Sequence, residues 1–208
     1  MLNGFQTKNY PFLHFISEGS SIPTDAAEEI LLLAKPSELT DNRGSRADYK
    51  ERVFLKDEYY SDYPQSIQDF LDSILSEDFI EHCKNEFDVD IVGSNLRIEL
   101  ACDVDGFFQV PHTDVGDKRI TWLTYLGTVE ENNDVGTDLY EDESTYALSA
   151  PWGFNNGLIF KPGPDSYHGF SKGKKINGNR KVLIINFVDN WNDRHELYKD
   201  EVIKWNWF

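Results

Sequence analysis

The feature that most constrains the fold is a succession of short strand-like runs in the second half of the chain. Between residues 91 and 188, apolar side chains recur at every second position in several runs, such as Leu96–Leu100 and Ile120–Leu126. This period is that of a β-strand with one buried face. Turn signals rich in glycine, proline and asparagine separate the runs. Several short strands joined by turns predict an antiparallel sandwich or barrel.

The first 90 residues carry mostly helical signals after an initial strand or extended arm within residues 1–22. Pro23 and Pro64 each precede a stretch in which apolar residues recur every three or four positions, and proline is favoured where a helix begins. A further helix is expected after the break at Ser76–Asp78. We therefore predict a mainly β fold with flanking helices: a double-stranded β-helix, that is, a jelly-roll or cupin-like barrel, braced by N-terminal helices.

A length of 208 residues suits one domain spanning residues 1–208. Within it we expect a helical N-terminal support region over residues 1–90, a jelly-roll catalytic core over 91–189 and a C-terminal helix over 190–208. The aromatic tail Trp205–Phe208 either packs on the body or forms a homodimer contact. The polar loop Asn42–Arg46 is expected to be solvated or to cover a substrate as a lid.

The charge and the cysteine content exclude several classes of protein. A formal net charge of -17 disfavours nucleic acid and anionic membranes as partners. No apolar run approaches the roughly 20 residues that span a bilayer, and no basic-then-apolar segment opens the chain. The two cysteines, Cys83 and Cys102, do not make a disulfide framework. We expect a cytoplasmic protein.

The motif Val110-Pro111-His112-Thr113-Asp114 carries the strongest chemical signal. His112 and Asp114 lie two residues apart, so both side chains project from the same side of an extended strand. One imidazole and one carboxylate are two of the three ligands of a facial iron site. His168 is the best third ligand, because it follows a proline-rich turn and the intervening strands can bring it back beside the motif.

Arg180 opens the last apolar strand and needs a partner. Burying an arginine is costly unless its charge is paired, and a guanidinium group matches a carboxylate with two hydrogen bonds. The partner is either a dicarboxylate ligand or one of the many acidic side chains of the chain. Val182, Ile184 and Asn186 should share the inward face with Arg180, while Lys181 should point to the opposite face.

Taken together, these residues resemble those of the iron(II)- and 2-oxoglutarate-dependent dioxygenases, in particular the branch similar to prolyl hydroxylases. The resemblance rests on His112-Thr113-Asp114, His168 and Arg180, and it covers roughly Leu96 to Val188. Tyr125-Leu126-Gly127 is similar to the strand whose tyrosine contacts the cosubstrate. Gly136-Thr137-Asp138-Leu139 is similar to the family's Gly-Gly-x-Leu turn, with Thr137 in place of the second glycine.

The resemblance implies an activity and a set of ligands. His112, Asp114 and His168 would bind iron(II), and Arg180 and Tyr125 would position 2-oxoglutarate. Oxidative decarboxylation of 2-oxoglutarate by O2 to succinate and CO2 would be coupled to hydroxylation of a substrate, with ascorbate as a candidate reductant.

The substrate itself is left open by the resemblance. A small molecule, a free amino acid and a peptidyl residue all remain candidates, whereas nucleic acid and membranes are not expected. The side chains expected to line the substrate site are Arg97, Arg119 and Asn186, with Glu99, Trp122 and the Arg43–Arg46 loop as further candidates.

Two interpretations from other classes compete with the oxygenase. A cupin-like, non-redox protein that binds a metal or a sugar, or acts as an isomerase, could use the same histidines. An interaction protein could recruit a partner through its aromatic C-terminus and keep only a vestigial metal motif. Neither requires Arg180 together with Tyr125, so these two residues favour the oxygenase.

Overall fold

The computed structural model describes residues 4–33, 50–114, 116–127 and 134–202. The loop Asn42–Arg46 and the tail Trp205–Phe208 lie outside these ranges, so the expected lid and the expected dimer contact stay predictions.

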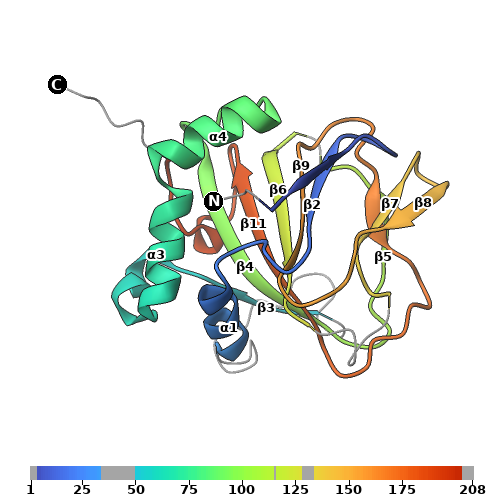
Figure 1. Cartoon of the computed structure of the whole chain (residues 1–208), viewed down its shortest axis with the longest axis horizontal. Coiled ribbons are helices and arrows are strands. Elements are labelled where there is room, and N and C mark those ends of the chain that lie inside the picture. The colour runs from blue at the N-terminus through green and yellow to red at the C-terminus, as the bar shows by residue number, and fades with distance from the viewer. Residues whose placement is uncertain (1–3, 34–49, 115, 128–133, 203–208) are drawn as a thin grey trace.

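Two antiparallel sheets form the body of the protein (Figure 1). The major sheet has the strand order β1-β2-β9-β6-β11-β4-β3, and the minor sheet has the order β5-β10-β7-β8. The major strands are β1 (Gln6–Lys8), β2 (His14–Ser17), β3 (Lys50–Phe54), β4 (Asn95–Asp103), β6 (Lys118–Tyr125), β9 (Asn156–Phe160) and β11 (Arg180–Val188). The minor strands are β5 (Gln109–His112), β7 (Asp138–Tyr140), β8 (Tyr146–Ser149) and β10 (His168–Phe170). The predicted mainly β architecture is confirmed.

Helices α1 (Thr24–Leu32), α3 (Gln65–Ile74) and α4 (Glu77–Phe87) cover the side of the major sheet that faces away from the minor sheet (Figure 1). Pro23 and Pro64 immediately precede α1 and α3, as predicted. Ser76 caps α4, because its hydroxyl accepts a hydrogen bond from the backbone N–H of Phe79. A 3-10 helix, η2 (Asp57–Asp62), precedes α3. No helix in the described ranges has the length and apolar character needed to span a membrane.

Along the three central strands β4, β11 and β6, successive side chains alternate between the two faces of the sheet. Ile98 pairs with Ile185, and Ile185 pairs with Trp122, so these three side chains share one face of the sheet. All three are at most 1% exposed, and they belong to the core beneath the helices. Trp122 is therefore a core residue and not part of the expected substrate site.

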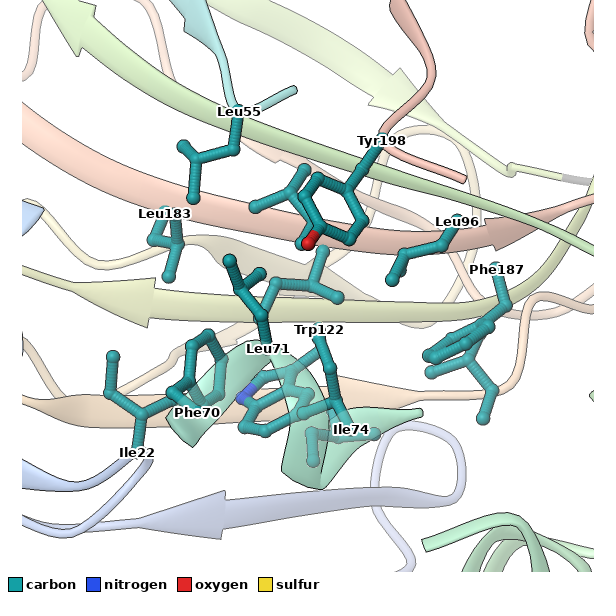
Figure 2. Close-up of a cluster of buried hydrophobic side chains, with 14 of the residues drawn as sticks. Ile22, Leu55, Phe70, Leu71, Ile74, Leu96, Trp122, Leu183, Phe187 and Tyr198 are labelled. Carbon is teal, nitrogen blue, oxygen red and sulfur yellow. The ribbon is translucent and has the colours of Figure 1, made fainter. Parts of the chain in front are cut away.

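Helix α3 supplies the other half of this core. Figure 2 shows Phe70, Leu71 and Ile74 of α3 reaching toward the sheet at Trp122 and Leu183. Their spacing of one, three and four residues puts the three helical side chains on one face. Burying a large apolar side chain contributes about 1.5–3 kcal/mol, so this layer stabilises the sheet from the helical side.

The opposite face of the same strands is polar. Asn186 pairs with Arg97 on β4 and with Thr121 on β6, and Arg180 pairs with Asp103. All five residues are buried, and they face the minor sheet. Charged groups inside a sandwich are costly unless they are paired or functional, so this inner face locates the candidate site.

Two parts of the predicted organisation were wrong. The first 90 residues are not purely a helical support: besides β1 and β2, which lie where an initial strand or extended arm was expected, they provide β3 to the major sheet. Residues 190–202 contain only the 3-10 helix η3 (Arg194–Glu196) where a C-terminal helix was expected. The segment runs along β4 instead, with Lys199 bridged to Leu96.

We expect Ile185→Ala to destabilise the fold by about 2–5 kcal/mol, because it opens a cavity in a core that is closed on both sides. Ile185 is 0% exposed. Urea unfolding would measure the change in the free energy of unfolding. Leu32→Ala is the control, since Leu32 is 77% exposed, and equal losses in the two variants would contradict this assignment of the core.

Candidate metal centre and its cavity

The pairing of β5 with β10 brings the two predicted histidine ligands together. His112 lies directly opposite His168 in this antiparallel pair, and their ring centroids are 4.4 Å apart. Gly169 permits the close approach of the strands, because a Cβ at this position would lie 2.6 Å from the carbonyl oxygen of Gln109. The predicted third ligand is thus in place, although residues 115–167 separate it from the motif along the chain.

Both imidazole rings are oriented by backbone carbonyl groups. The Nδ1 of His112 donates to the Val110 carbonyl at 3.0 Å, and the Nδ1 of His168 donates to the Ser166 carbonyl at 3.0 Å. Each Nε2 therefore keeps its lone pair, which is the arrangement found in metal-binding histidines. Gln109 confirms this for His112, since its side-chain amide lies 2.9 Å from Nε2 and can only donate to it.

Asp114 completes the group. Its carboxylate oxygens lie 3.6 Å from Nε2 of His112 and 3.4 Å from Nε2 of His168. Burial alone would raise its pKa, but the adjacent imidazole groups of both histidines and the charge of Lys118 outweigh burial and hold the pKa well below its usual range. Lys118 lies 2.9 Å and the Thr121 hydroxyl 3.1 Å from Oδ2. The carboxylate is therefore ionised and fixed in place.

This donor set fits iron(II). The ligand atoms of His112, Asp114 and His168 all lie within 4.8 Å of one another. Two neutral imidazole nitrogens and one carboxylate on one side of a metal leave the other side free for small ligands. The triad lines a cavity of about 220 Å³ between the two sheets, so a bound metal would face a space large enough for small molecules.

Arg180 lines the same cavity and is already ion-paired. Its Nη1 donates to Oδ2 of Asp103 at 2.6 Å, its Nε donates to the Val135 carbonyl at 2.6 Å, and its Nη2 lies 3.3 Å from the Thr137 hydroxyl. Lys50 also lines the cavity and lies 3.9 Å from the other carboxylate oxygen of Asp103. Together the two cations and Asp103 leave one net positive charge at this end of the cavity.

Tyr125 stands behind Arg180 and is not among the cavity-lining residues. Its hydroxyl accepts a hydrogen bond from the backbone N–H of Thr137 at 3.2 Å, and its ring centroid lies 5.8 Å from the guanidinium carbon of Arg180. Gly136 allows this turn to pack closely, because a Cβ there would lie 1.8 Å from the Ala150 carbonyl oxygen. The structure thus places Tyr125 where it supports Arg180.

The candidate substrate residues divide into two groups. Arg97, Glu99 and Asn186 line the cavity, as expected. Arg119 does not, because its guanidinium group binds Asp189 at 2.6 Å on the outside of the sheet. The cause is a break in register: Phe187 pairs with Ile120, but Val188 pairs with Lys118. This irregularity exchanges the faces of neighbouring residues.

Lys118 therefore takes the inward position that the sequence pattern assigned to Arg119. Its own sequence context offered no signal, because the exchange depends on a local irregularity. Lys50, Arg52 and Trp191, which also line the cavity, were missed as well. They belong to segments whose pairing with β4 was not predicted.

Glu99 is the buried acid at the other end of the cavity, and its pKa is strongly displaced. Burial would raise the pKa, but the charges of Arg97, Lys50, Arg52 and Lys118 outweigh burial and lower it to about 2. Glu99 is only 3% exposed. An ionised carboxylate is thus held inside the protein by surrounding cations.

The fold and the triad define a class of structure. A prolyl hydroxylase from Trichoplax adhaerens, in complex with a hypoxia inducible factor oxygen degradation domain peptide fragment, matches with a TM-score of 0.56 and 15% identity. That match covers 90% of this chain and 84% of the other. A prolyl-4-hydroxylase from Pseudomonas putida matches with a TM-score of 0.54 and 10% identity, over 90% and 94% of the two chains.

A 2OG-Fe(II) oxygenase family oxidoreductase from Burkholderia pseudomallei matches with a TM-score of 0.56 and 10% identity, over 90% of this chain and 87% of the other. No protein-family model and no curated protein sequence matches the chain. The chain therefore has the double-stranded β-helix fold of the 2-oxoglutarate oxygenases, as the sequence resemblance predicted. Its His112–Asp114–His168 triad is consistent with a facial iron-binding site.

We expect the stability that Glu99 contributes to disappear at acidic pH. Its pKa is about 2 in the folded protein and about 4.3 in an unfolded chain. A lowered folded-state pKa gives stability that is full above the unfolded value and is lost as the pH falls toward 2. The gap in melting temperature between the wild type and Glu99→Gln should therefore be wider at pH 7 than at pH 3.

Thermal unfolding of both proteins at the two pH values measures this gap. Glu28→Gln is the control, because Glu28 is an exposed residue of α1 and its gap should stay near zero. A gap for Glu99→Gln that does not change with pH would contradict the assigned role of the surrounding cations.

Proposed function

We propose that the protein is an iron(II)- and 2-oxoglutarate-dependent oxygenase. It hydroxylates a small molecule, an amino acid or a peptidyl residue and releases succinate and CO2. The observation that carries this proposal is the convergence of His112, Asp114 and His168, with both imidazole rings oriented by backbone carbonyl groups, on one cavity of an oxygenase fold. O2 is the oxidant and ascorbate is a candidate reductant. The proposed location is the cytoplasm.

Each residue of the cavity has a defined part in this proposal. The two histidines and Asp114 hold iron(II), which when bound supplies the oxygen chemistry. The Val110 and Ser166 carbonyls bind the Nδ1 atoms and so orient both imidazole rings, and Lys118 and Thr121 fix the Asp114 carboxylate. Arg180, supported by Tyr125, offers positive charge to the distal carboxylate of 2-oxoglutarate, and Lys50 adds to it.

One observation favours the alternative of a cupin-like, non-redox protein that binds a metal or a sugar or acts as an isomerase. Asp103 already satisfies one side of the Arg180 guanidinium group, so Arg180 has a structural partner without any cosubstrate. Against this, Asp103 is offset by both Arg180 and Lys50, and the remaining positive charge faces the cavity. The two experiments below separate the alternatives.

The first experiment tests the function itself. Anaerobic addition of iron(II) and then 2-oxoglutarate to the protein should produce the visible charge-transfer band of the iron chelate, and admitting air should release succinate. His168→Gln should remove both signals, since it removes a neutral nitrogen ligand without opening a large cavity. His195→Gln is the control, because His195 is an exposed residue far from the triad along the chain. Iron binding without the band would overturn the 2-oxoglutarate assignment.

The second experiment tests Arg180. Removing Arg180 alone would strand the buried Asp103 carboxylate at a cost of about 3–5 kcal/mol, so Asp103→Asn/Arg180→Gln removes both charges together. Loss of a charge-assisted contact worth about 1.5–3 kcal/mol should raise the 2-oxoglutarate concentration for half-maximal band intensity by roughly 10- to 100-fold. Iron(II) affinity should not change.

Lys181→Gln is the matched control for the double variant. Lys181 is the next residue on β11, but it pairs with Cys102 on the outer face, and its Nζ reaches the Leu31 carbonyl at 3.4 Å. A double variant that needs no more 2-oxoglutarate than Lys181→Gln would show that Arg180 is only structural.

A further inference from the structure

Asn186 carries a buried side-chain amide that has no hydrogen-bond partner among the described residues. It is 0% exposed, and neither its Oδ1 nor its Nδ2 makes a hydrogen bond in the described part of the chain. Leaving buried polar groups unpaired destabilises a folded protein. Asn186 nevertheless lines the cavity. An amide that keeps one free donor and one free acceptor there is suited to a ligand with both kinds of group.

Arg97 is the neighbour of Asn186 across β4 and is held rigidly. Its Nε donates to Glu196 at 2.8 Å and its Nη2 donates to Glu99. The rings of Phe54 and Trp191 each lie with their centroids 5.0 Å from its guanidinium carbon. None of the described residues accepts a hydrogen bond from Nη1 of Arg97, so this edge of the guanidinium group can donate to a ligand.

The ion pairs of Arg97 contain equal numbers of positive and negative groups, because the nearby Lys118 and Lys50 pair with Asp114 and Asp103 instead. Arg52 lies 3.9 Å from Glu99 and 3.9 Å from Glu196, so two guanidinium groups face two carboxylates. A ligand with net charge would leave one buried charge uncompensated, which is strongly unfavourable. A ligand that brings one positive and one negative group preserves the balance.

We propose that this end of the cavity binds the substrate as a free α-amino acid, which deepens the proposed function and rests on it only for the reaction that follows. The carboxylate binds Nη1 of Arg97 and Nδ2 of Asn186. The ammonium group binds Glu99 and Oδ1 of Asn186. An amino acid that is N-acylated or amidated lacks one of the two charges and therefore brings a net charge into this balanced set of ion pairs.

The metal triad lies beside this set of groups. Thr121 is the partner of Asn186 on β6, and its hydroxyl binds Asp114 at 3.1 Å. An amino acid held by its charged end at Arg97, Glu99 and Asn186 therefore has its side chain available to the triad. Arg180, at the end of the cavity proposed for 2-oxoglutarate, is six residues from Asn186 along β11. The two ligands therefore occupy opposite ends of the cavity.

Binding of free amino acids to the whole protein tests the proposal directly. The twenty protein-forming L-amino acids are titrated by calorimetry into the protein alone and into the protein with manganese(II) and 2-oxoglutarate. The N-acetyl and carboxamide forms of the tightest binder follow. We expect the free amino acid to bind at least tenfold more tightly than either blocked form. Equal affinity of a blocked form, or no binding by any of the twenty, would overturn the proposal.

Asn186→Leu provides the decisive variant. Leucine has a similar size and removes two unpaired polar atoms, so the melting temperature should stay the same or rise. Affinity for the amino acid should fall at least tenfold, with manganese(II) affinity unchanged. Ser17→Ala is the control: its buried hydroxyl is also unpaired among the described residues, but it lies on β2 outside the cavity lining. Wild-type affinity in Asn186→Leu would refute the proposal.

This test and the test of the proposed function can fail independently. Amino-acid binding without the charge-transfer band would leave the binding site standing and remove the oxygenase. The band without amino-acid binding would keep the oxygenase and remove this substrate class.

Discussion

The structure depends on the register between β4, β11 and β6. Residues that pair across the three strands point their side chains to the same face of the sheet, and the next set of paired residues points to the opposite face. The row of Ile98, Ile185 and Trp122 therefore enters the apolar core beneath the helices, and the next row, Arg97, Asn186 and Thr121, enters the cavity. A slip of one residue would put charges into the core and apolar groups into the cavity. The apolar face thus enforces the geometry of the polar face, and the helices stabilise the site without touching it.

Much of this arrangement follows from the sequence, because strand periodicity is a local property. The inward face of β11 and the outward direction of Lys181 were confirmed, as were the starts of α1 and α3. His168 was identified because a facial triad needs a third ligand, and its pairing with His112 fulfils that need.

What could not be predicted depends on interactions that are distant along the chain. The exchange of Lys118 for Arg119 comes from a register irregularity against β11, and no local pattern encodes it. The segment after Asn190 has helix-compatible residues, but its backbone groups pair with β4 at Leu96, and Tyr198 and Val202 bury themselves in the core. This tertiary pairing overrides local propensity, and it also brings Glu196 to Arg97. The prediction of a helix gave no reason to expect the contact between Glu196 and Arg97.

The two ends of the cavity handle buried charge in different ways, and the difference bears on what each can bind. At Arg180, two cations flank one carboxylate, so the protein keeps an uncompensated positive charge that attracts an anion. At Arg97, two guanidinium groups pair with two carboxylates, and the amide of Asn186, which has no partner among the described residues, lies on the neighbouring strand. An anion gains Coulomb energy at the first end only, because at the second end each favourable contact is offset by a neighbouring carboxylate. Two small ligands, one anionic and one without net charge, can therefore bind at different ends of the same cavity, with the metal triad between the sheets.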